Sequence, residues 1–482
     1  MRLPLISLKN VFESSTLMTL FSLSSKSLVF VIVTPFLLST FTVEEIALWY
    51  ILGVFINLQS LADFGFYNTF VRTIALSLSG GCTTIEDLNR IQDLNRNVGD
   101  ANISLAGSII GTMRRVYNSL TFVIFIVLLL LSPLLYKSVS VIANPLEGWL
   151  CWIVVVLFSV INFWGRPYSN FLLAQNEVAL VRKWEGVFNM IAMIANLIVI
   201  SFFKSLLLLV LSNQIWILIN VIRNRYLANN SGCYSFRDFA SYKYNKVVMS
   251  YIWPLAWRAG LSSLITRGVV GASGLIYAQF GSAASASSYL FAEKLYTSLR
   301  AFAIAPFYSK IPLLVTLRGQ EKIKEWESTS QRCMLYASSI LVLGIIFFDL
   351  FGSYLFCIIK SNVVFPNHSL WLLIGWAYLL HRYGAMHTQL YTTINKVNSH
   401  ISDLITGVIM ILFWFFLAKD LDVYVFPLGM LTGYLGFYIW YAGYYSYRNI
   451  MRSIFSFEAK ANLPPFLVLL LYTLVIAIIS RY

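Results

Sequence analysis

The stretch SLTFVIFIVLLLLSPLLY, residues 119–136, decides the fold class of this chain. It carries no charged residue, and with its flanks it reaches the roughly 20 apolar residues that an α-helix needs to cross a bilayer. Strands of a membrane barrel are shorter, at about 10 residues, and alternate strictly between apolar and polar positions. The stretch does not alternate. The sequence therefore predicts an all-α polytopic membrane protein.

Twelve further segments of the chain share this long apolar character. The thirteen predicted spans are residues 16–40, 45–79, 113–136, 148–175, 179–203, 205–227, 250–279, 284–317, 333–359, 366–395, 399–418, 422–447 and 464–480. The last of them follows Pro464 and Pro465, so a peripheral or re-entrant helix is an alternative to a true span there.

Composition agrees with the membrane prediction, since 58% of the residues are hydrophobic and 12% are charged. The net charge of +14 does not indicate nucleic-acid binding, because the basic residues are spread over many short loops. Of the 35 Lys and Arg residues, 21 fall in alternate loops together with the N-terminus, and five fall in the opposite loops. The excess of basic residues in cytoplasmic loops predicts a cytoplasmic N-terminus.

Two hydrophilic stretches organise the chain. Residues 80–112 are expected to form a solvated loop or a short surface helix, and residues 228–249 a cytoplasmic linker. The predicted domains are 1–227, an N-terminal six-helix lobe; 228–249, the linker; 250–447, a C-terminal six-helix lobe; and 448–482, a segment with a possible thirteenth helix.

The two lobes show weak internal similarity. With an offset of 239 residues, Phe41, Ala47 and Tyr50 match Phe280, Ala286 and Tyr289. Both repeats would run in the same direction, because an even number of spans separates them. Parallel repeats are typical of transporters whose substrate site lies between the halves. We therefore expect two six-helix lobes in parallel repeat around a central cavity, plus an extra C-terminal helix.

Nine basic residues lie inside the apolar segments, where a charge costs at least ~2.5–3.5 kcal/mol and is retained mainly for function. They are Lys26, Arg72, Arg166, Arg258, Arg267, Lys294, Arg300, Lys310 and Arg382. Only three carboxylates lie at comparable depth, namely Asp63, Glu293 and Asp349. The excess of basic residues over carboxylates at this depth predicts a cationic pocket for an anionic substrate. The candidate substrate-binding residues are Lys26, Arg267, Arg300, Arg166, Arg382, Arg72 and Arg258, with Asp63 and Glu293 as candidate coupling residues.

Each candidate also has a purely structural interpretation. Lys26 and Arg72 could extend their side chains to the membrane surface. Asp63 could hold helices together by pairing with a neighbouring cation, and Glu293 could pair with Arg300, which follows two helical turns later. His381 and His387, near Arg382, could relay protons or simply be packed polar residues.

Other kinds of site lack sequence support. The five cysteines include no C-x-x-C pair, and no cluster of metal-ligand type is present, so neither a metal nor another cofactor is expected. No loop is large enough for a soluble catalytic domain, and we expect a transporter rather than an enzyme. The first span is expected to serve as its own insertion signal, without a cleaved leader.

The stretch EEIALWYILGVFINLQSLADFGFYNTFVRTIA, residues 44–75, resembles the second span of the polysaccharide flippases, especially the O-antigen (Wzx-type) translocases. In that family a Gly/Ala-x-Trp-Tyr entry precedes an Asp-x-Gly segment and a downstream Arg. Ala47, Trp49, Asp63, Gly65 and Arg72 stand at those places. The resemblance places the chain in the multidrug, oligosaccharidyl-lipid and polysaccharide exporter superfamily.

The resemblance implies translocation of an undecaprenyl-pyrophosphate-linked oligosaccharide, an O-antigen-type repeat unit of lipopolysaccharide biosynthesis, across the bacterial inner membrane by alternating access. It also implies contact with membrane lipids, and with the polymerase and chain-length regulator of the same pathway. We expect a monomer. Arginine suits the pyrophosphate, which it binds through paired charge-assisted hydrogen bonds. The thirteenth helix departs from the O-antigen branch and leaves the sub-branch open.

Two alternatives remain open at this stage. A membrane polymerase or glycosyltransferase would act on the same lipid-linked sugars, but it needs catalytic groups on a sizeable outer loop. A drug exporter of the same superfamily would suit cationic compounds, which call for carboxylates rather than for the basic residues found here.

Overall fold

The computed structural model describes residues 15–79, 101–308, 310–320, 322–392, 399–448 and 453–480. These residues form helices joined by turns and short loops, and none of them lies in a strand. The chain divides into two compact units, Met1–Leu264 and Ile265–Tyr482. The boundary lies inside the predicted seventh span. The domain limits expected from the sequence stay predictions.

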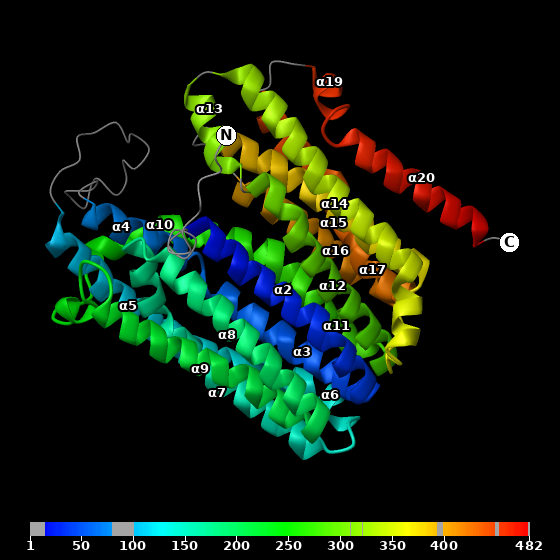
Figure 1. Cartoon of the computed structure of the whole chain (residues 1–482), viewed down its shortest axis with the longest axis horizontal. Helices are drawn as coiled ribbons and strands as arrows, with labels where there is room; N and C mark the ends of the chain where they lie inside the picture. The colour runs from blue at the N-terminus through cyan, green and yellow to red at the C-terminus, as the bar shows by residue number, and fades with distance from the viewer. Residues whose placement is uncertain are drawn as a thin grey trace, which may run out of the picture. The chain divides into compact units, whose positions relative to one another are not determined.

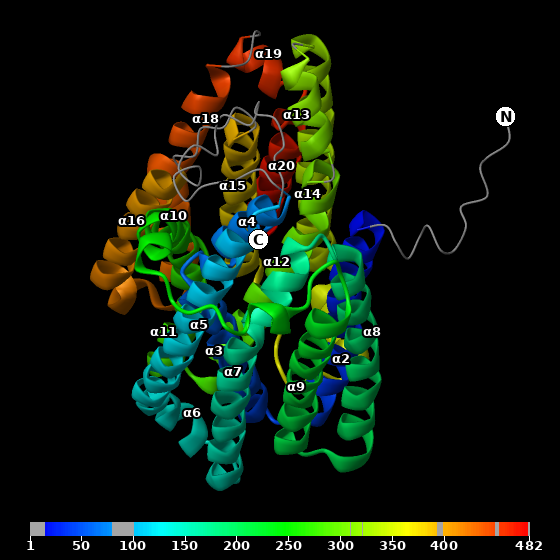
Figure 2. The same cartoon turned by 90° about the vertical axis from the view of Figure 1, so that its left-hand side faces the viewer.

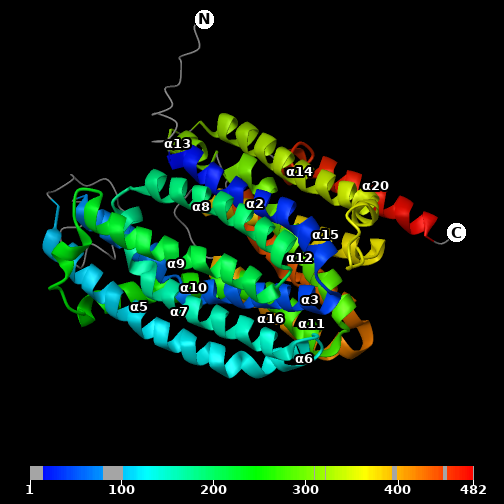
Figure 3. The same cartoon turned by 60° about the horizontal axis from the view of Figure 1, so that its bottom comes forward.

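The first unit is built of long helices that run side by side (Figure 1). They are α2 (Ser15–Thr40), α3 (Val43–Gln59), α4 (Phe66–Leu78), α5 (Ile103–Leu131), α7 (Pro145–Ala174), α8 (Val178–Ile198), α9 (Leu206–Asn230) and α10 (Lys246–Ser263), with the shorter η1 (Ser60–Asp63), η3 (Ser132–Leu135), α6 (Tyr136–Ser140), η4 (Val199–Phe203) and η5 (Phe236–Phe239). The most extensive packing joins α2 to α8 and α7 to α9 (Figure 3).

The second unit contains a similar set of helices. They are η6 (Leu264–Val269, which begins at the last residue of the first unit), α11 (Val270–Phe280), α12 (Ala283–Tyr308), α13 (Ile311–Gly319), α14 (Ile323–Ile358), α15 (His368–Thr392), α16 (Ser399–Leu421), η7 (Asp422–Tyr424), α17 (Val425–Gly433), η8 (Tyr434–Tyr438), α18 (Ile439–Tyr447), α19 (Ile454–Glu458) and α20 (Leu463–Ile479). Helix α14 packs on α12, α15 and α20. Figure 2 shows α19 near the same end of the unit as α13.

Local sequence signals explain where several helices begin. The side chains of Asn102, Asn144 and Ser205 accept hydrogen bonds from backbone N–H groups in the first turns of α5, α7 and α9. Because Asn102 caps α5, that helix begins ten residues before the predicted limit of 113. The described part of the predicted hydrophilic stretch is therefore mostly helix, and residues 80–100 lie outside the described parts of the chain.

The apolar helices confirm the prediction of a multi-pass membrane protein. Seven helices among the described residues are long and apolar enough to cross a bilayer. Their outer surfaces carry large apolar side chains, such as Leu130, 73% exposed, and Phe415, 79% exposed, which suit contact with lipid. The other predicted spans are also helical where described, although several are broken into shorter pieces. The thirteenth, α20, is an apolar helix of 17 residues.

Candidate functional site

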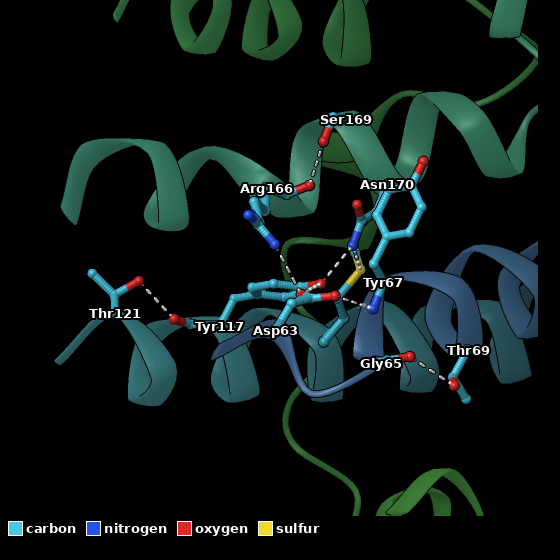
Figure 4. A network of polar contacts seen from close by, with 10 residues as sticks. Asp63, Gly65, Tyr67, Thr69, Tyr117, Thr121, Arg166, Ser169 and Asn170 are labelled. Carbon is cyan, nitrogen blue, oxygen red and sulfur yellow. Dashed lines mark hydrogen bonds and ion pairs between the residues drawn. The ribbon is translucent and has the colours of Figure 1, made fainter. Parts of the chain in front are cut away.

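A buried polar network in the first unit joins α4, α5 and α7 around Asp63 (Figure 4). Oδ1 of Asp63 accepts a hydrogen bond of 2.5 Å from Tyr117 Oη and lies 3.4 Å from Nη1 of Arg166. Its Oδ2 accepts a hydrogen bond of 2.8 Å from the backbone N–H of Tyr67. Asn170 Nδ2 donates to Tyr117 Oη over 3.0 Å. Two of the predicted site residues, Asp63 and Arg166, are therefore brought together.

A break in the predicted second span places Asp63 in this network. Phe64 and Gly65 have φ values of 47° and 72°, which end the helical path before α4 begins. This left-handed conformation is easily adopted by glycine. The break also brings the backbone of Phe64 against Gly260 of α10, where an added Cβ would lie 2.6 Å from it. The Asp-x-Gly segment thus turns the carboxylate toward the start of α4.

The remaining candidates of the first unit do not join this network. Lys26, Arg72 and Arg258 are exposed on α2, α4 and α10. The serines around Lys26 serve helix packing, because Ser22 Oγ donates to Glu185 of α8 over 3.1 Å and Ser25 Oγ accepts from Asn189 over 3.0 Å. The side chain of Arg267 lies outside the described residues.

A second polar cluster lies in the second unit, between α12 and α15. Tyr378 Oη donates a hydrogen bond of 2.9 Å to Oε2 of Glu293, while Oε1 of Glu293 is buried and has no hydrogen-bond partner in the described parts of the chain. The guanidinium of Arg300 lies 5.9 Å from the centre of the Tyr378 ring and acts electrostatically on Glu293. Glu293 and Arg300 are therefore neighbours, as the sequence spacing suggested.

Among the predicted cations whose side chains the structure describes, Arg382 of α15 is the most deeply buried, with 1% of the residue exposed. Its guanidinium lies 5.8 Å from the centre of the Phe307 ring, and its Nε and Nη2 atoms have no hydrogen-bond partner among the residues that the structure describes. Within the described parts of the chain, no carboxylate forms an ion pair with it. Removing a cation from water without a partner is unfavourable, so this side chain can accept an anion.

A small cavity lies in the same unit, close to Arg382. It is lined in part by His381, Asp403, Thr406, Tyr434 and Tyr438. The ring of His381 stacks on that of Tyr438 with an angle of 3° between the planes. Tyr434 and Tyr438 belong to the π-helical segment η8, and such segments are frequent at functional sites.

Two histidine–carboxylate pairs were missed by sequence reasoning. His368 Nδ1 lies 3.0 Å from Oδ1 of Asp349, and His387 Nε2 lies 3.1 Å from Oε1 of Glu458. Neither pair is close in sequence, and only the polar residue types themselves could have drawn attention to them. Among the described residues, no group of three or more His, Cys, Asp or Glu residues could hold a metal ion.

Glu458 is held by several donors. Besides His387, Tyr447 Oη donates to Oε1 over 2.9 Å and Asn462 Nδ2 donates to Oε2 over 2.8 Å. Burial alone would raise the pKa of Glu458, but the contacts with His387, Asn462 and Tyr447 outweigh burial and hold this pKa below its ordinary value. The carboxylate of Glu458 is therefore ionised near neutral pH.

Similar folds occur among solved structures of transporters. The MATE multidrug transporter DinF-BH, solved as a complex, aligns with a TM-score of 0.62 and 13% identity over 93% of this chain and 97% of that chain. An inward-facing multidrug resistance MATE family transporter of the MOP superfamily aligns with a TM-score of 0.60 and 14% identity, over 89% and 98% of the two chains.

A MOP superfamily transporter from Pyrococcus furiosus, described as having a binding pocket of reverse polarity that suggests a different function, aligns with a TM-score of 0.58 and 12% identity. The alignment covers 92% of this chain and 95% of that chain. No protein-family model and no curated protein matches the sequence. The shared architecture confirms the expected all-helical fold, and this chain has the fold of the MATE transporters of the MOP superfamily.

Proposed function

We propose that this protein is a flippase. It moves an undecaprenyl-pyrophosphate-linked oligosaccharide, an O-antigen-type repeat unit, from the inner to the outer leaflet of the bacterial inner membrane by alternating access. Its N-terminus is cytoplasmic in this proposal, and it works as a monomer beside the polymerase and the chain-length regulator of the pathway. The resemblance of residues 44–75 to the Wzx-type translocases supports this substrate class.

The observation that carries the proposal is the buried guanidinium of Arg382, whose Nε and Nη2 atoms have no hydrogen-bond partner among the described residues. A cation in this position is stable only if an anion or ordered water completes its shell. A pyrophosphate group offers several oxygen acceptors, and arginine binds such oxygens by charge-assisted hydrogen bonds. Arg300 lies close enough to Arg382 to act on it electrostatically, so the two charges together favour a multiply charged anion.

The other predicted cations have different roles in the proposed transport. Arg166 is compensated by Asp63 and is better suited to holding α7 against α4 than to binding an anion directly. The exposed Lys26, Arg72 and Arg258 are available for acidic sugars or lipid phosphates. Asp63 is already paired with Arg166, whereas Oε1 of Glu293 has no hydrogen-bond partner among the described residues, so Glu293 is the better candidate for coupling transport to protons.

The fold is compatible with this mechanism. Structures described as inward-facing and outward-facing conformations of MATE family transporters both resemble this chain, with TM-scores of 0.60 and 0.58. The fold thus accommodates two access states in those proteins. The transporter from Pyrococcus furiosus described with reverse pocket polarity indicates that pocket charge varies within the superfamily.

The test is the binding of undecaprenyl pyrophosphate by the purified full-length protein. We expect Arg382→Ala and Arg300→Ala to weaken binding at least tenfold, and Arg382→Lys to restore part of it. Arg448→Ala is a matched control, because Arg448 also lies over an aromatic ring, that of Tyr444, but is exposed. Unchanged affinity in Arg382→Ala protein that folds normally would refute the proposed binding site.

Drug export is a second candidate, because three of the similar structures are described as multidrug or multidrug resistance transporters. A cationic drug requires a carboxylate that is free to receive it. Glu293 is available, but Arg300 lies beside it and disfavours a second cation. Binding of the cationic dye ethidium in preference to undecaprenyl pyrophosphate would favour export of drugs.

A further inference from the structure

Helix α9 of the first unit carries a row of buried polar atoms that have no hydrogen-bond partner among the described residues. The row takes one atom from each of four side chains, namely Ser212 Oγ, Trp216 Nε1, Asn220 Oδ1 and Arg223 Nη1. These residues recur every three or four positions, so they lie on one face of the helix, which we call the α9 stripe. A buried polar atom without a partner costs free energy, and native proteins contain few of them. The row therefore indicates a place where the protein meets a polar partner.

The other faces of α9 have ordinary surroundings. Val221 packs against α7, where its Cγ1 atom would lie 2.5 Å from a Cβ added to Gly165. The guanidinium of Arg225 lies 5.7 Å from the centre of the Trp164 ring, which also belongs to α7. Ile222 is 58% exposed and suits contact with lipid. The α9 stripe is therefore separate from both the face that packs on α7 and the face that meets lipid.

The α9 stripe lies next to α8, which packs beside α9 (Figure 1). The centre of the Phe188 ring, from α8, lies 5.9 Å from the ring centre of Trp216 and 5.5 Å from the guanidinium of Arg223. Asn196 of α8 and Asn213 of α9 exchange two hydrogen bonds, of 3.3 and 3.2 Å. All four residues of the stripe keep part of their surface exposed. The stripe is therefore not sealed inside the first unit.

Positive charge is in excess at the Arg223 end of the stripe. Nη1 of Arg182 lies 2.8 Å from Oε2 of Glu185, and Ser22 Oγ donates a hydrogen bond of 3.1 Å to the same oxygen. Lys26 and Arg223 also interact electrostatically with Glu185. Among the described residues, three cations from α2, α8 and α9 thus face the one negative charge of Glu185. An anionic group on a ligand would be attracted to this end.

The chemical types of the four atoms fit a carbohydrate. Arg223 Nη1 and Trp216 Nε1 only donate hydrogen bonds. Asn220 Oδ1 only accepts them, and Ser212 Oγ does both. Sugar hydroxyl groups both donate and accept, whereas an ionised phosphate has no donor to offer to Asn220. The negative face of an aromatic ring such as that of Trp216 also attracts the C–H groups of a sugar.

The length of the stripe suits a short oligosaccharide rather than a single sugar. Ser212 and Arg223 are eleven positions apart in the sequence. At the rise of an α-helix, this separation corresponds to roughly 16 Å along α9. A chain of sugars lying along the helix could therefore contact all four residues in turn, with its anionic group at the end where the cations gather.

We propose that the α9 stripe binds the oligosaccharide of the lipid-linked substrate, with an acidic sugar at Arg223. This inference rests on the proposed flippase function and deepens it, because it assigns a site in the first unit to the sugars. Sugar hydroxyl groups form hydrogen bonds with Ser212, Trp216 and Asn220. A sugar carboxylate pairs with the guanidinium of Arg223. Binding thereby completes the hydrogen bonds of the stripe.

The first test measures binding of trigalacturonate, a soluble acidic trisaccharide, to the purified full-length protein by isothermal titration calorimetry. We expect Arg223→Ala to weaken binding at least tenfold, because the carboxylate loses its partner. Arg225→Ala is the matched control, since Arg225 lies two residues further on and also over an aromatic ring, but faces α7. Its affinity should equal that of the wild type. Equal affinities of Arg223→Ala and Arg225→Ala would overturn the proposal.

A second pair of variants tests the uncharged part of the stripe. The side-chain amides of Asn220 and Asn230 each donate to the carbonyl four residues earlier, over 2.8 and 2.9 Å. Asn230 is exposed and lies outside the stripe. We expect Asn220→Ala to weaken trigalacturonate binding several-fold and Asn230→Ala to leave it unchanged. An unchanged affinity in Asn220→Ala would remove this residue from the site.

Ser212→Ala separates a binding role from a structural role. Ser212 Oγ has no hydrogen-bond partner among the described residues, so the variant loses none of the contacts described for the chain. Replacing a buried polar atom that lacks a partner by an apolar group is neutral or stabilising. We therefore expect the unfolding temperature of the protein without sugar to stay the same or rise, while the affinity for trigalacturonate falls. A lower unfolding temperature with an unchanged affinity would make Ser212 a structural residue.

The indole signals of the protein labelled with ¹⁵N-tryptophan locate the bound sugar. The chain has 13 tryptophans, and Trp216→Phe assigns the signal of Trp216. Trigalacturonate should shift this signal, and the neutral trisaccharide maltotriose should bind more weakly. Inorganic pyrophosphate tests for a simple anion site: if it shifts the Trp216 signal with the same affinity as trigalacturonate, the stripe binds phosphate rather than sugar. If trigalacturonate leaves the Trp216 signal unshifted, the stripe is only a row of hydration sites and the proposal is wrong.

Binding of undecaprenyl pyrophosphate, which carries no sugar, separates this proposal from the flippase proposal. If that binding depends on Arg382 while trigalacturonate binding ignores Arg223, the sugar site is wrong and the pyrophosphate site stands. If trigalacturonate binding depends on Arg223 while undecaprenyl pyrophosphate binding ignores Arg382, the sugar site stands and the pyrophosphate site is wrong.

Discussion

Arg166, whose side chain is 19% exposed, forms an ion pair across 3.4 Å with the buried Asp63, and Tyr117 donates a hydrogen bond to the same carboxylate oxygen. The pair connects the break between α3 and α4 to α7, and α5 completes it. The first unit thus neutralises its deep arginine internally, whereas Arg382 in the second unit has no such ion pair among the described residues. Arg166 has a carboxylate partner, so we expect it to matter for stability. Arg382 has none among the described residues, so we expect it to matter for anion binding.

Replacement of Asp63 should destabilise the protein. Asp63→Asn leaves the Arg166 charge without its counter-charge. Because Arg166 is partly exposed, we expect a loss below the ~3–5 kcal/mol that breaking a fully buried pair costs. We expect a lower thermal unfolding temperature of the purified protein. In the double variant Asp63→Asn/Arg166→Gln, the decrease in unfolding temperature should be smaller than the sum of the decreases in the two single variants. Additive losses would show that the two side chains do not interact.

Replacement of Tyr117 should have a smaller effect in the same direction. Tyr117→Phe removes the hydrogen bond to Asp63 and leaves Asn170 Nδ2 without that acceptor. A hydrogen bond to a charged group contributes about 1.5–3 kcal/mol. Thermal unfolding measures the loss, and Tyr136→Phe serves as the control, because Tyr136 is 68% exposed. A Tyr117→Phe protein as stable as that control would contradict the importance of this bond.

A side chain at Gly260 should disturb the break between α3 and α4. The Cβ of Gly260→Ala would lie 2.6 Å from the backbone of Phe64, which is closer than such atoms can approach. We expect a lower unfolding temperature and reduced transport. Gly53→Ala is the matched control, since nothing lies within 4 Å of its Cβ and alanine favours a helix by up to about 1 kcal/mol. Equal stability of the two variants would show that the contact relaxes freely.

Acid should loosen α19 from the second unit. The pKa of Glu458 is lowered in the folded protein, so its contribution to stability is complete above the unfolded value of about 4.3 and is lost as the pH falls through the folded value. Hydrogen exchange of residues 453–462 should therefore increase below about pH 4. In Glu458→Gln this step should disappear. If hydrogen exchange of these residues in the wild-type protein does not change between pH 6 and 3, the ionised Glu458 does not contribute to the stability of this segment.

The sequence predicted the class of fold well, because runs such as residues 119–136 leave few alternatives in a bilayer. It also singled out Asp63 and Arg166, since charges are rare in such segments. It could not pair them, because 103 residues separate the two and no local spacing encodes the contact. Nothing in the sequence distinguishes Tyr117 from the other 27 of the 28 tyrosines. Glu458 lies in a segment without a clear helical pattern, so its contacts could not be predicted.

The anchoring of α20 has a consequence for the lipid that surrounds the protein. Its 17 residues span about 25 Å, which is less than the ~30 Å hydrocarbon core of an average bilayer. Tyr472 and Thr473 fix its height against Asp349 and Trp376, so the helix cannot slide to adjust. If α20 crosses the membrane as predicted, this mismatch favours local thinning of the bilayer around it. Lipids with longer acyl chains should then strain these two polar contacts, and the protein should be most stable in thin membranes.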